Sequence, residues 1–121
     1  MSEQFQELLD RDAILERVGG DVAFLQELVD IFAEDSLRLL QSIRVAIVAG
    51  DSHGLEYAAH TLKGSIANFG AETVRETAFR LEVLGRNGDL APATEICSIL
   101  EREVAQFMQA LNALARQLAQ R

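Results

Sequence analysis

The chain has 121 residues, of which 49% are hydrophobic and 25% charged, with one proline and one cysteine. This length fits a single domain, and the composition argues against a disordered chain, a collagen-like repeat or a disulfide scaffold. Nineteen acidic residues against eleven basic ones give a formal net charge of −8. This charge disfavours nucleic acid and anionic membranes as partners, because both are polyanions. A protein or a small ligand is the expected partner.

The sequence also bears on location. The segment Met1–Asp10 is acidic and lacks the basic start and the apolar stretch of a signal peptide. No apolar run approaches the roughly 18 to 20 residues that a membrane span requires. A single cysteine cannot form an internal disulfide, so nothing indicates an oxidising compartment. We therefore expect a cytoplasmic protein.

The first two expected elements are helices. A short helix begins at Asp10 or Asp12, either of which can cap it, and ends at Gly19-Gly20. Asp21 then caps a long helix that continues to Gly50. The apolar residues of the long helix recur at helical spacing, and they are Leu25, Val29, Phe32, Leu39, Ile43 and Ile47.

Two shorter helices follow in the middle of the chain. The first begins at Asp51 or Ser52 and ends at Gly70, and its apolar face consists of Leu55, Ala58, Ala59, Leu62, Ile66 and Phe69. The second ends at Asn87-Gly88, and its apolar face consists of Val74, Ala78, Leu81 and Gly85. The turn between them predicts a helical hairpin.

The last helix is expected to start at Asp89 and Pro92, as an N-cap and a first-turn proline. Its apolar face consists of Cys97, Leu100, Val104, Phe107, Leu111, Leu114 and Leu118. Cys97 belongs to this face, so we interpret it as a buried small hydrophobic residue.

These elements predict an all-α fold, an antiparallel up-down four-helix bundle with a short N-terminal capping helix. We expect the whole chain, residues 1–121, to form one domain. At 1.5 Å per residue, the two outer helices of about 29 residues span roughly 43 Å and the inner hairpin about 25 Å. Helical bundles perform many functions, so the function must come from a site.

His60 marks that site, on the third expected helix. At 100° per residue, His60 lies about 140° from the centre of the apolar face, Lys63 about 80° and Gly64 about 180°. A glycine inside a helix costs about 1 kcal/mol relative to alanine. Gly64 beside an outward histidine indicates that a large partner approaches the imidazole closely. Helix packing that needs no side chain at this position is the alternative.

The hairpin adds Glu82 to the site. If the turn is centred on Gly70-Ala71, residues equidistant from position 71 lie at the same height, as do His60 and Glu82. A carboxylate at this height can accept a hydrogen bond from Nδ1–H and leave the Nε2 lone pair outward, although an ordinary solvated glutamate is the alternative. His60, Glu82 and Lys63 together provide a nucleophile, a carboxylate and an ammonium, the parts of a phosphoryl acceptor.

The residues around His60 also resemble the motif of a known family. Ala59-His60-Thr61-Leu62-Lys63-Gly64-Ser65, followed by Asn68-Phe69-Gly70-Ala71, resembles the signature of histidine-containing phosphotransfer (HPt) domains. The flanking residues Gly19-Gly20-Asp21, Gly50-Asp51 and Leu81-Glu82 agree with this resemblance.

The resemblance covers roughly residues 10 to 115 and implies a phosphorelay intermediate without kinase activity of its own. His60 would accept a phosphoryl group on Nε2 from the aspartyl phosphate of a receiver domain, as in a hybrid histidine kinase. It would pass the group to the aspartate of a response regulator. Lys63 would stabilise the phosphoryl group, Gly64 would leave room for docking and Glu82 would orient the imidazole. The chain itself would bind no cofactor, since magnesium would come from the partner receiver domain.

We expect a docking surface around His60 that includes Tyr57, Ala67, Arg75 and Arg86. The two arginines could complement an acidic receiver pocket, although solvated charges are the ordinary interpretation of such residues. We expect the protein to act as a monomer.

Three alternatives remain beside the phosphorelay hypothesis. His53, Glu56 and His60 share one helix face and suggest a metal site, but two imidazoles about 10.5 Å apart along the axis cannot share an ion without bending the helix. The chain could also be a non-phosphorylated helical adaptor that binds a receiver domain or kinase, or a self-associating helical module. The intact set of His60, Lys63 and Gly64 favours the phosphorelay intermediate, and we expect no metal site.

Overall fold

In the computed structural model, which describes residues 9–120, the chain forms helices without any strand in that range. They are α2 (Arg11–Val18), α3 (Val22–Ala49), α4 (Ser52–Ala67), α5 (Glu72–Asn87) and α6 (Ala93–Ala119). The all-α prediction is confirmed for these residues. The parts of the predicted domain before residue 9 and after residue 120 lie outside the described residues.

Aspartate side chains cap α2, α3 and α4. Each carboxylate accepts a hydrogen bond of 2.9–3.0 Å from the backbone N–H three residues further on. The capping residues are Asp10, Asp21 and Asp51. Asp12 and Ser52, the alternatives for two of these positions, lie inside the first turns of α2 and α4. The sequence signals for helix starts were therefore reliable here, because capping is a local interaction.

The end of α4 differs from the prediction. The helix was expected to continue to Gly70, but it ends at Ala67 with Asn68 as its C-cap. The backbone N–H groups of residues 68–70 donate to carbonyls only three residues back, at 3.0–3.3 Å. This tighter turn replaces the last α-helical turn, as is common at helix ends. Phe69 still reaches the core and is buried.

The start of α6 is the second correction. Asp89 was expected to be its N-cap, but α6 begins at Ala93 with Pro92 in the N-cap position. The backbone N–H of Asp89 instead donates to the carbonyl of Leu84 at 3.0 Å, next to a left-handed Gly88. This pattern is a Schellman motif, so Asp89 belongs to the end of α5.

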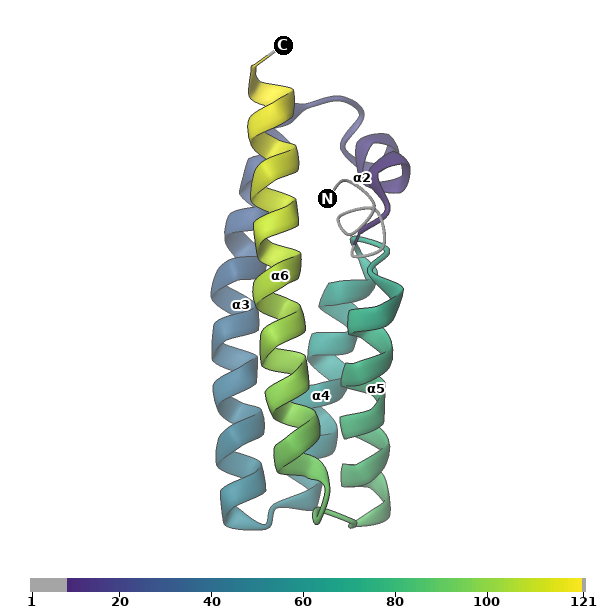
Figure 1. The fold of residues 1–121 in the computed structure, drawn as a ribbon, viewed down its shortest axis with the longest axis vertical. Coiled ribbons are helices and arrows are strands. Elements are labelled where there is room, and N and C mark those ends of the chain that lie inside the picture. Colours follow the sequence, from purple (N-terminus) through teal and green to yellow (C-terminus); the bar gives the residue numbers. More distant parts are fainter. Residues whose placement is uncertain (1–8, 121) are drawn as a thin grey trace.

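The four longer helices pack as a closed ring, in which α3 contacts α4 and α6 and α5 contacts the same two helices. Figure 1 shows α3 and α6 extending well beyond the α4–α5 hairpin, with α2 above the turn of that hairpin. At 1.5 Å per residue, the 28 residues of α3 span about 42 Å and the 16 residues of α4 about 24 Å. The predicted contrast between long outer helices and a short hairpin is confirmed.

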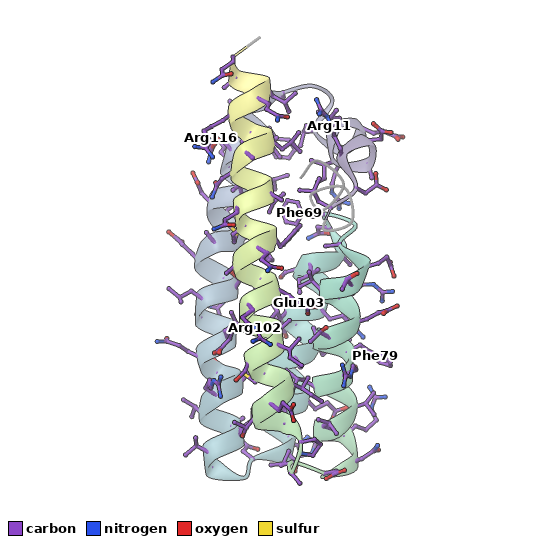
Figure 2. The ribbon with its side chains drawn as sticks, in the orientation of Figure 1. Arg11, Phe69, Phe79, Arg102, Glu103 and Arg116 are labelled. Atoms are coloured by element: carbon purple, nitrogen blue, oxygen red, sulfur yellow. The ribbon has the colours of Figure 1, made fainter. Side chains whose placement is uncertain are left out.

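The core closes at the turn of the hairpin. Phe32 of α3, Phe69 of the turn and Phe107 of α6 meet edge to face, with ring centroids 5.3–5.7 Å apart. Edge-to-face packing is a favourable arrangement for aromatic rings. Figure 2 shows Phe69 above the hairpin and directed toward α6. Cys97 on α6 is fully buried, as predicted, and its burial raises the pKa of the thiol.

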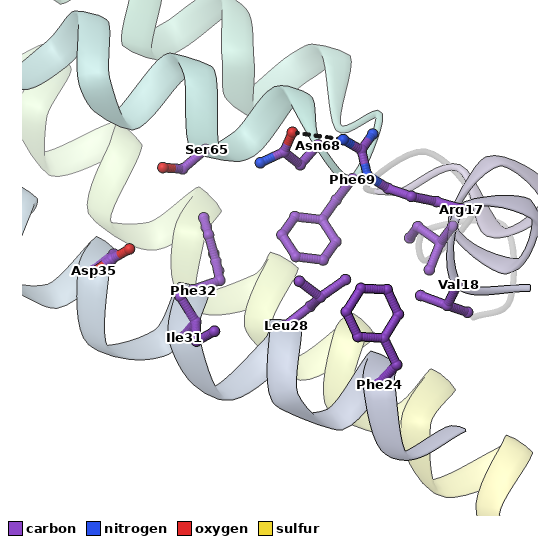
Figure 3. A pocket seen from close by; sticks show the side chains of 11 residues that line it. Arg17, Val18, Phe24, Leu28, Ile31, Phe32, Asp35, Ser65, Asn68 and Phe69 are labelled. Carbon is purple, nitrogen blue, oxygen red and sulfur yellow. Dashed lines mark hydrogen bonds between the residues drawn. The ribbon is translucent and has the colours of Figure 1, made fainter. Parts of the chain in front are cut away.

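A pocket of about 300 Å³ lies between α2, α3 and the end of α4 (Figure 3). Its rim includes a hydrogen bond of 3.3 Å from the Arg17 guanidinium to the Asn68 side chain. The remaining lining is mainly apolar and includes Ile14, Val18, Phe24, Leu28, Ile31, Phe32 and Phe69. Over residues 9–120, none of the helices is both long enough and apolar enough to cross a membrane.

Candidate functional site

His60 lies on the outer side of α4. The opposite face of α4 packs into the core through Leu55, Ala58, Ala59, Leu62 and Ile66. The side chain of His60 is 64% exposed, which agrees with its position in the helical periodicity. An imidazole on a rigid helix and open to solvent is accessible to a partner.

Glu82 of α5 lies behind His60. The glutamate side chain is only 4% exposed, and its Oε2 lies 3.1 Å from Nδ1 of His60. An ionised carboxylate can only accept a hydrogen bond, so Nδ1 is the donor and the lone pair of the neutral ring is on Nε2. The register of the hairpin predicted this pair, and the structure brings the two residues together. Glu82 is therefore not an ordinary solvated glutamate.

Lys63 approaches the other oxygen of the same carboxylate. Its Nζ lies 2.7 Å from Oε1 of Glu82, so the two side chains form an ion pair. The same Nζ lies 4.9 Å from the centroid of the Phe79 ring. With a side chain only 20% exposed, Lys63 is held against α5 in this state.

Arg86 is the third basic residue at this carboxylate. Its Nη2 donates to Oε2 of Glu82 at 2.7 Å, and its Nε donates to Oε2 of Glu56 at 3.1 Å. Arg86 thus connects a glutamate of α4 to the buried glutamate of its own helix. Glu82 is compensated by His60, Lys63 and Arg86, which explains how a carboxylate can remain in the core.

The pKa of Glu82 reflects this environment. Burial acts to raise the pKa, but the contacts with Lys63 and His60 outweigh it and lower the pKa below the ordinary value of 4.5. Glu82 is therefore ionised at neutral pH and can stabilise positive charge that develops on the imidazole.

Two glycines of the hairpin have opposite surroundings. A Cβ added at Gly64 would meet no described atom within 4 Å, so the helix surface beside His60 is open. A Cβ added at Gly85 would lie 2.6 Å from the backbone nitrogen of Glu56 and 2.8 Å from the carbonyl oxygen of Ser52. Gly64 thus leaves the surface clear, whereas Gly85 lets the backbones of α4 and α5 approach closely.

A groove of about 350 Å³ runs along the His60 face of the hairpin, lined by His53, Glu56, Tyr57, His60, Glu82 and Arg86. Tyr57 and Arg86, two members of the predicted docking surface, therefore lie beside His60. Ala67 is exposed at the end of α4. Arg75 forms an ion pair of 2.8 Å with Glu72 at the start of α5 and does not line the groove. Among residues 9–120, no three His, Cys, Asp or Glu side chains are arranged to hold a metal ion.

Sequence reasoning missed two contacts of this site. Glu56 was considered only as a metal ligand, and Phe79 was not considered at all. Position 71 is equidistant from Glu56 and Arg86, and also from Lys63 and Phe79. The register argument that paired His60 with Glu82 could therefore have identified both contacts.

Comparison with known proteins gives a consistent result. The family model described as the Hpt domain matches residues 27–120. The phosphorelay intermediate protein rdeA of Dictyostelium discoideum is 26% identical over 103 residues, which are 85% of this chain. The chain spans only 41% of the length of that relative.

A solved structure resembles the whole fold. The crystal structure of histidine-containing phosphotransfer protein B (HptB) from Pseudomonas aeruginosa PAO1 matches with a TM-score of 0.84 and 28% identity. The match covers 91% of this chain and 96% of that protein. Because the family model matches well over half of the chain, the chain belongs to the Hpt domain family.

Proposed function

We propose that the chain is a phosphorelay intermediate that carries a phosphoryl group on Nε2 of His60. The observation that carries this proposal is the hydrogen bond of His60 Nδ1 to the buried Glu82, which leaves the other ring nitrogen as the nucleophile. The resemblance to a phosphorelay intermediate and to a histidine-containing phosphotransfer protein supports the same function.

The transfer is a reversible exchange between nitrogen and oxygen. Nε2 of His60 attacks the aspartyl phosphate of a receiver domain, the phosphorus–oxygen bond to the aspartate breaks, and the aspartate leaves as a carboxylate. The imidazole gains positive charge, which the Glu82 carboxylate stabilises through Nδ1–H. The reverse attack by the aspartate of a response regulator completes the relay. Lys63 supplies positive charge for the phosphoryl oxygens.

Docking is the second part of the proposal. Gly64 leaves the surface beside His60 open for a receiver domain, and Tyr57, Ala67, Arg75 and Arg86 surround the area that the receiver covers. The magnesium ion that this chemistry uses belongs to the receiver domain, and an upstream hybrid histidine kinase supplies the phosphoryl group. The chain acts as a carrier without kinase activity, as a cytoplasmic monomer. The closed packing of α3–α6 supports the finer description of the fold as an antiparallel up-down four-helix bundle with α2 as its capping helix.

The test is phosphoryl transfer from a phosphorylated receiver domain with magnesium. We expect an increase in intact mass equal to one phosphoryl group, lost in acid and stable in base, as phosphohistidine is. The group should map to His60 and be absent from His60→Gln, while His53→Gln, with the other histidine replaced, should still carry it. Binding to receiver domains without any transfer would contradict the carrier function and favour the non-phosphorylated adaptor.

A further inference from the structure

Lys63 is the only lysine of the chain, and two neighbours hold it. Its Nζ lies 2.7 Å from Oε1 of Glu82 and 4.9 Å from the centroid of the Phe79 ring. A lysine side chain loses much rotamer freedom when it is ordered. Its 20% exposure next to an open helix surface therefore depends on these specific contacts.

The ring of Phe79 lies at the surface of the hairpin. The buried face of α5 includes Val74, Ala78 and Leu81, and Phe79 falls outside this face with 42% exposure. Figure 2 shows the ring projecting from the outer edge of α5. A cation within about 6 Å of an aromatic centroid is attracted by the negative face of the ring. The geometry thus places Phe79 as a support for the ammonium of Lys63.

The charges around Glu82 indicate which cation can leave it. Arg86 donates hydrogen bonds to two carboxylates, those of Glu82 and Glu56. Lys63 contacts one carboxylate, through a single ion pair with Oε1 of Glu82. A phosphoryl group on His60 would add about two negative charges beside the site. Lys63 is therefore the cation that can exchange partners at the lowest cost, while Arg86 keeps Glu82 compensated.

We propose that Phe79 is a positioning residue for Lys63, whose ammonium rests on the ring while it exchanges Oε1 of Glu82 for an oxygen of the phosphoryl group on His60. This inference rests on the proposed phosphorelay function. An aromatic ring can support this exchange because the attraction for a cation extends over the whole face of the ring. The ammonium of Lys63 can therefore move from Glu82 toward the phosphoryl group and stay in contact with Phe79. The ring is also neutral and does not repel the phosphoryl group, as a second carboxylate would.

The first test measures the NMR signals of the Lys63 side chain and needs no phosphoryl transfer. Because the chain has one lysine, protein labelled with ¹³C-lysine gives one set of side-chain NMR signals. We expect the ring current of Phe79 to shift the Hε signals of Lys63 upfield, Phe79→Leu to remove this shift and Phe79→Tyr to retain it. Phe24→Leu is the matched control, because Phe24 is 41% exposed and lines the distant pocket beneath α2. Unchanged lysine signals in Phe79→Leu would overturn the proposal.

The second test is a double-mutant cycle in phosphoryl transfer. With a phosphorylated receiver domain that loads the unsubstituted chain, Phe79→Leu should slow loading about two- to five-fold, the size of one cation–π contact at a partly exposed site. The effect should vanish when Phe79→Leu is combined with Lys63→Ala, because the ring acts only through the lysine. Phe79→Tyr should restore the rate. An equal slowing in both backgrounds would show that the ring contacts the partner directly and would overturn the proposal.

The two tests separate this inference from the proposed function. If the unsubstituted chain takes up no phosphoryl group, the phosphorelay function fails, and the exchange of Lys63 onto a phosphoryl group fails with it. The NMR signals would still report whether Phe79 holds the lysine. If the chain loads but Phe79→Leu loads equally fast, the function stands and the role of Phe79 is wrong. Thermal melting of each variant shows whether a lost rate reflects lost folding.

Discussion

Nδ1 of His60 lies 3.1 Å from Oε2 of Glu82, although the two residues are 22 positions apart in the chain. The end of α4, the turn of the hairpin and more than half of α5 lie between them. The exposed fractions of the two side chains are very different, at 64% for the histidine and 4% for the glutamate. The imidazole of His60 is therefore accessible from outside, while the carboxylate that it contacts is protected from water. This arrangement permits exchange with a large partner without loss of the ring orientation.

The first prediction concerns His60. His60→Gln should abolish phosphoryl uptake, because no other side chain offers an imidazole held by Glu82. Its melting temperature should stay close to that of the unsubstituted chain, since the replaced side chain is mostly exposed. Intact mass after incubation with a phosphorylated receiver domain measures uptake, and circular dichroism measures folding. His53→Gln is the matched control. Residual uptake by His60→Gln would show that the acceptor is another residue.

The second prediction compares two glycines of the hairpin. Gly64→Ala should raise the free energy of unfolding by about 0.5–1 kcal/mol, because alanine favours a helix and no described atom opposes its Cβ. Gly64→Gln should also raise the free energy of unfolding, because glutamine favours a helix over glycine, but it should slow phosphoryl transfer, since its longer side chain obstructs docking beside His60.

Gly85→Ala is the control for that pair of variants. Its Cβ would lie 2.6 Å from the backbone nitrogen of Glu56, so we expect it to lower the free energy of unfolding by about 1–3 kcal/mol. Chemical denaturation distinguishes these outcomes. A transfer rate of Gly64→Gln equal to that of the unsubstituted chain would refute the steric role of Gly64.

The third prediction concerns Lys63. Lys63→Ala should slow phosphoryl transfer or shorten the phosphohistidine lifetime by roughly 10- to 100-fold, the value of one interaction with a charged group. Folding should be affected less, because His60 and Arg86 still compensate Glu82. Arg80→Ala removes an exposed cation from the neighbouring helix and should change neither quantity. Rates and lifetimes measured by quenched time courses test this expectation, and an unaffected Lys63→Ala would remove the role of the ammonium.

The fourth prediction is a pH dependence that originates in Glu82. The pKa of Glu82 is lowered on folding, so its ionised form stabilises the native state. This contribution is complete above the ordinary value of 4.5 and is lost as the pH falls through the lower native pKa. Glu82→Gln should therefore be less stable at pH 7 by roughly 1–3 kcal/mol.

The difference in stability between the unsubstituted chain and Glu82→Gln should shrink below pH 4.5. Urea denaturation at a series of pH values measures it. Comparing the two proteins at each pH removes the contributions of Glu72 and Glu101, whose pKa values are also lowered. A difference that is the same at pH 7 and at pH 3 would mean that the charge of Glu82 does not stabilise the fold.

The part of the fold that the sequence predicted correctly depends on interactions between residues close together in the chain. Apolar residues at helical spacing identified the helices, and Asp21 and Gly50 marked both ends of α3. These signals work because a helix is held by contacts between residues three or four positions apart. Asp89 was misassigned for the same reason. Its side chain suits an N-cap, but its backbone is already engaged in closing α5.

The sequence predicted only part of the site. The periodicity placed His60 outside, and the register about position 71 paired it with Glu82, because the height of residues in a hairpin depends mainly on where the turn lies. The same reasoning left an ordinary solvated glutamate open as the alternative for Glu82, because equal height does not determine burial.

By itself, the sequence determined the helices, the exposed position of His60 and the glycine beside it, since each depends on neighbours within the same helix. Only the tertiary structure decided that Glu82 is buried, that Lys63 and Arg86 share its carboxylate, and that the ammonium of Lys63 lies over the ring of Phe79. These features depend on how far α5 is rotated about its axis and how closely it approaches α4 at Gly85. Packing of the whole core determines that rotation and distance, because the many side chains of the interior must fit together at once.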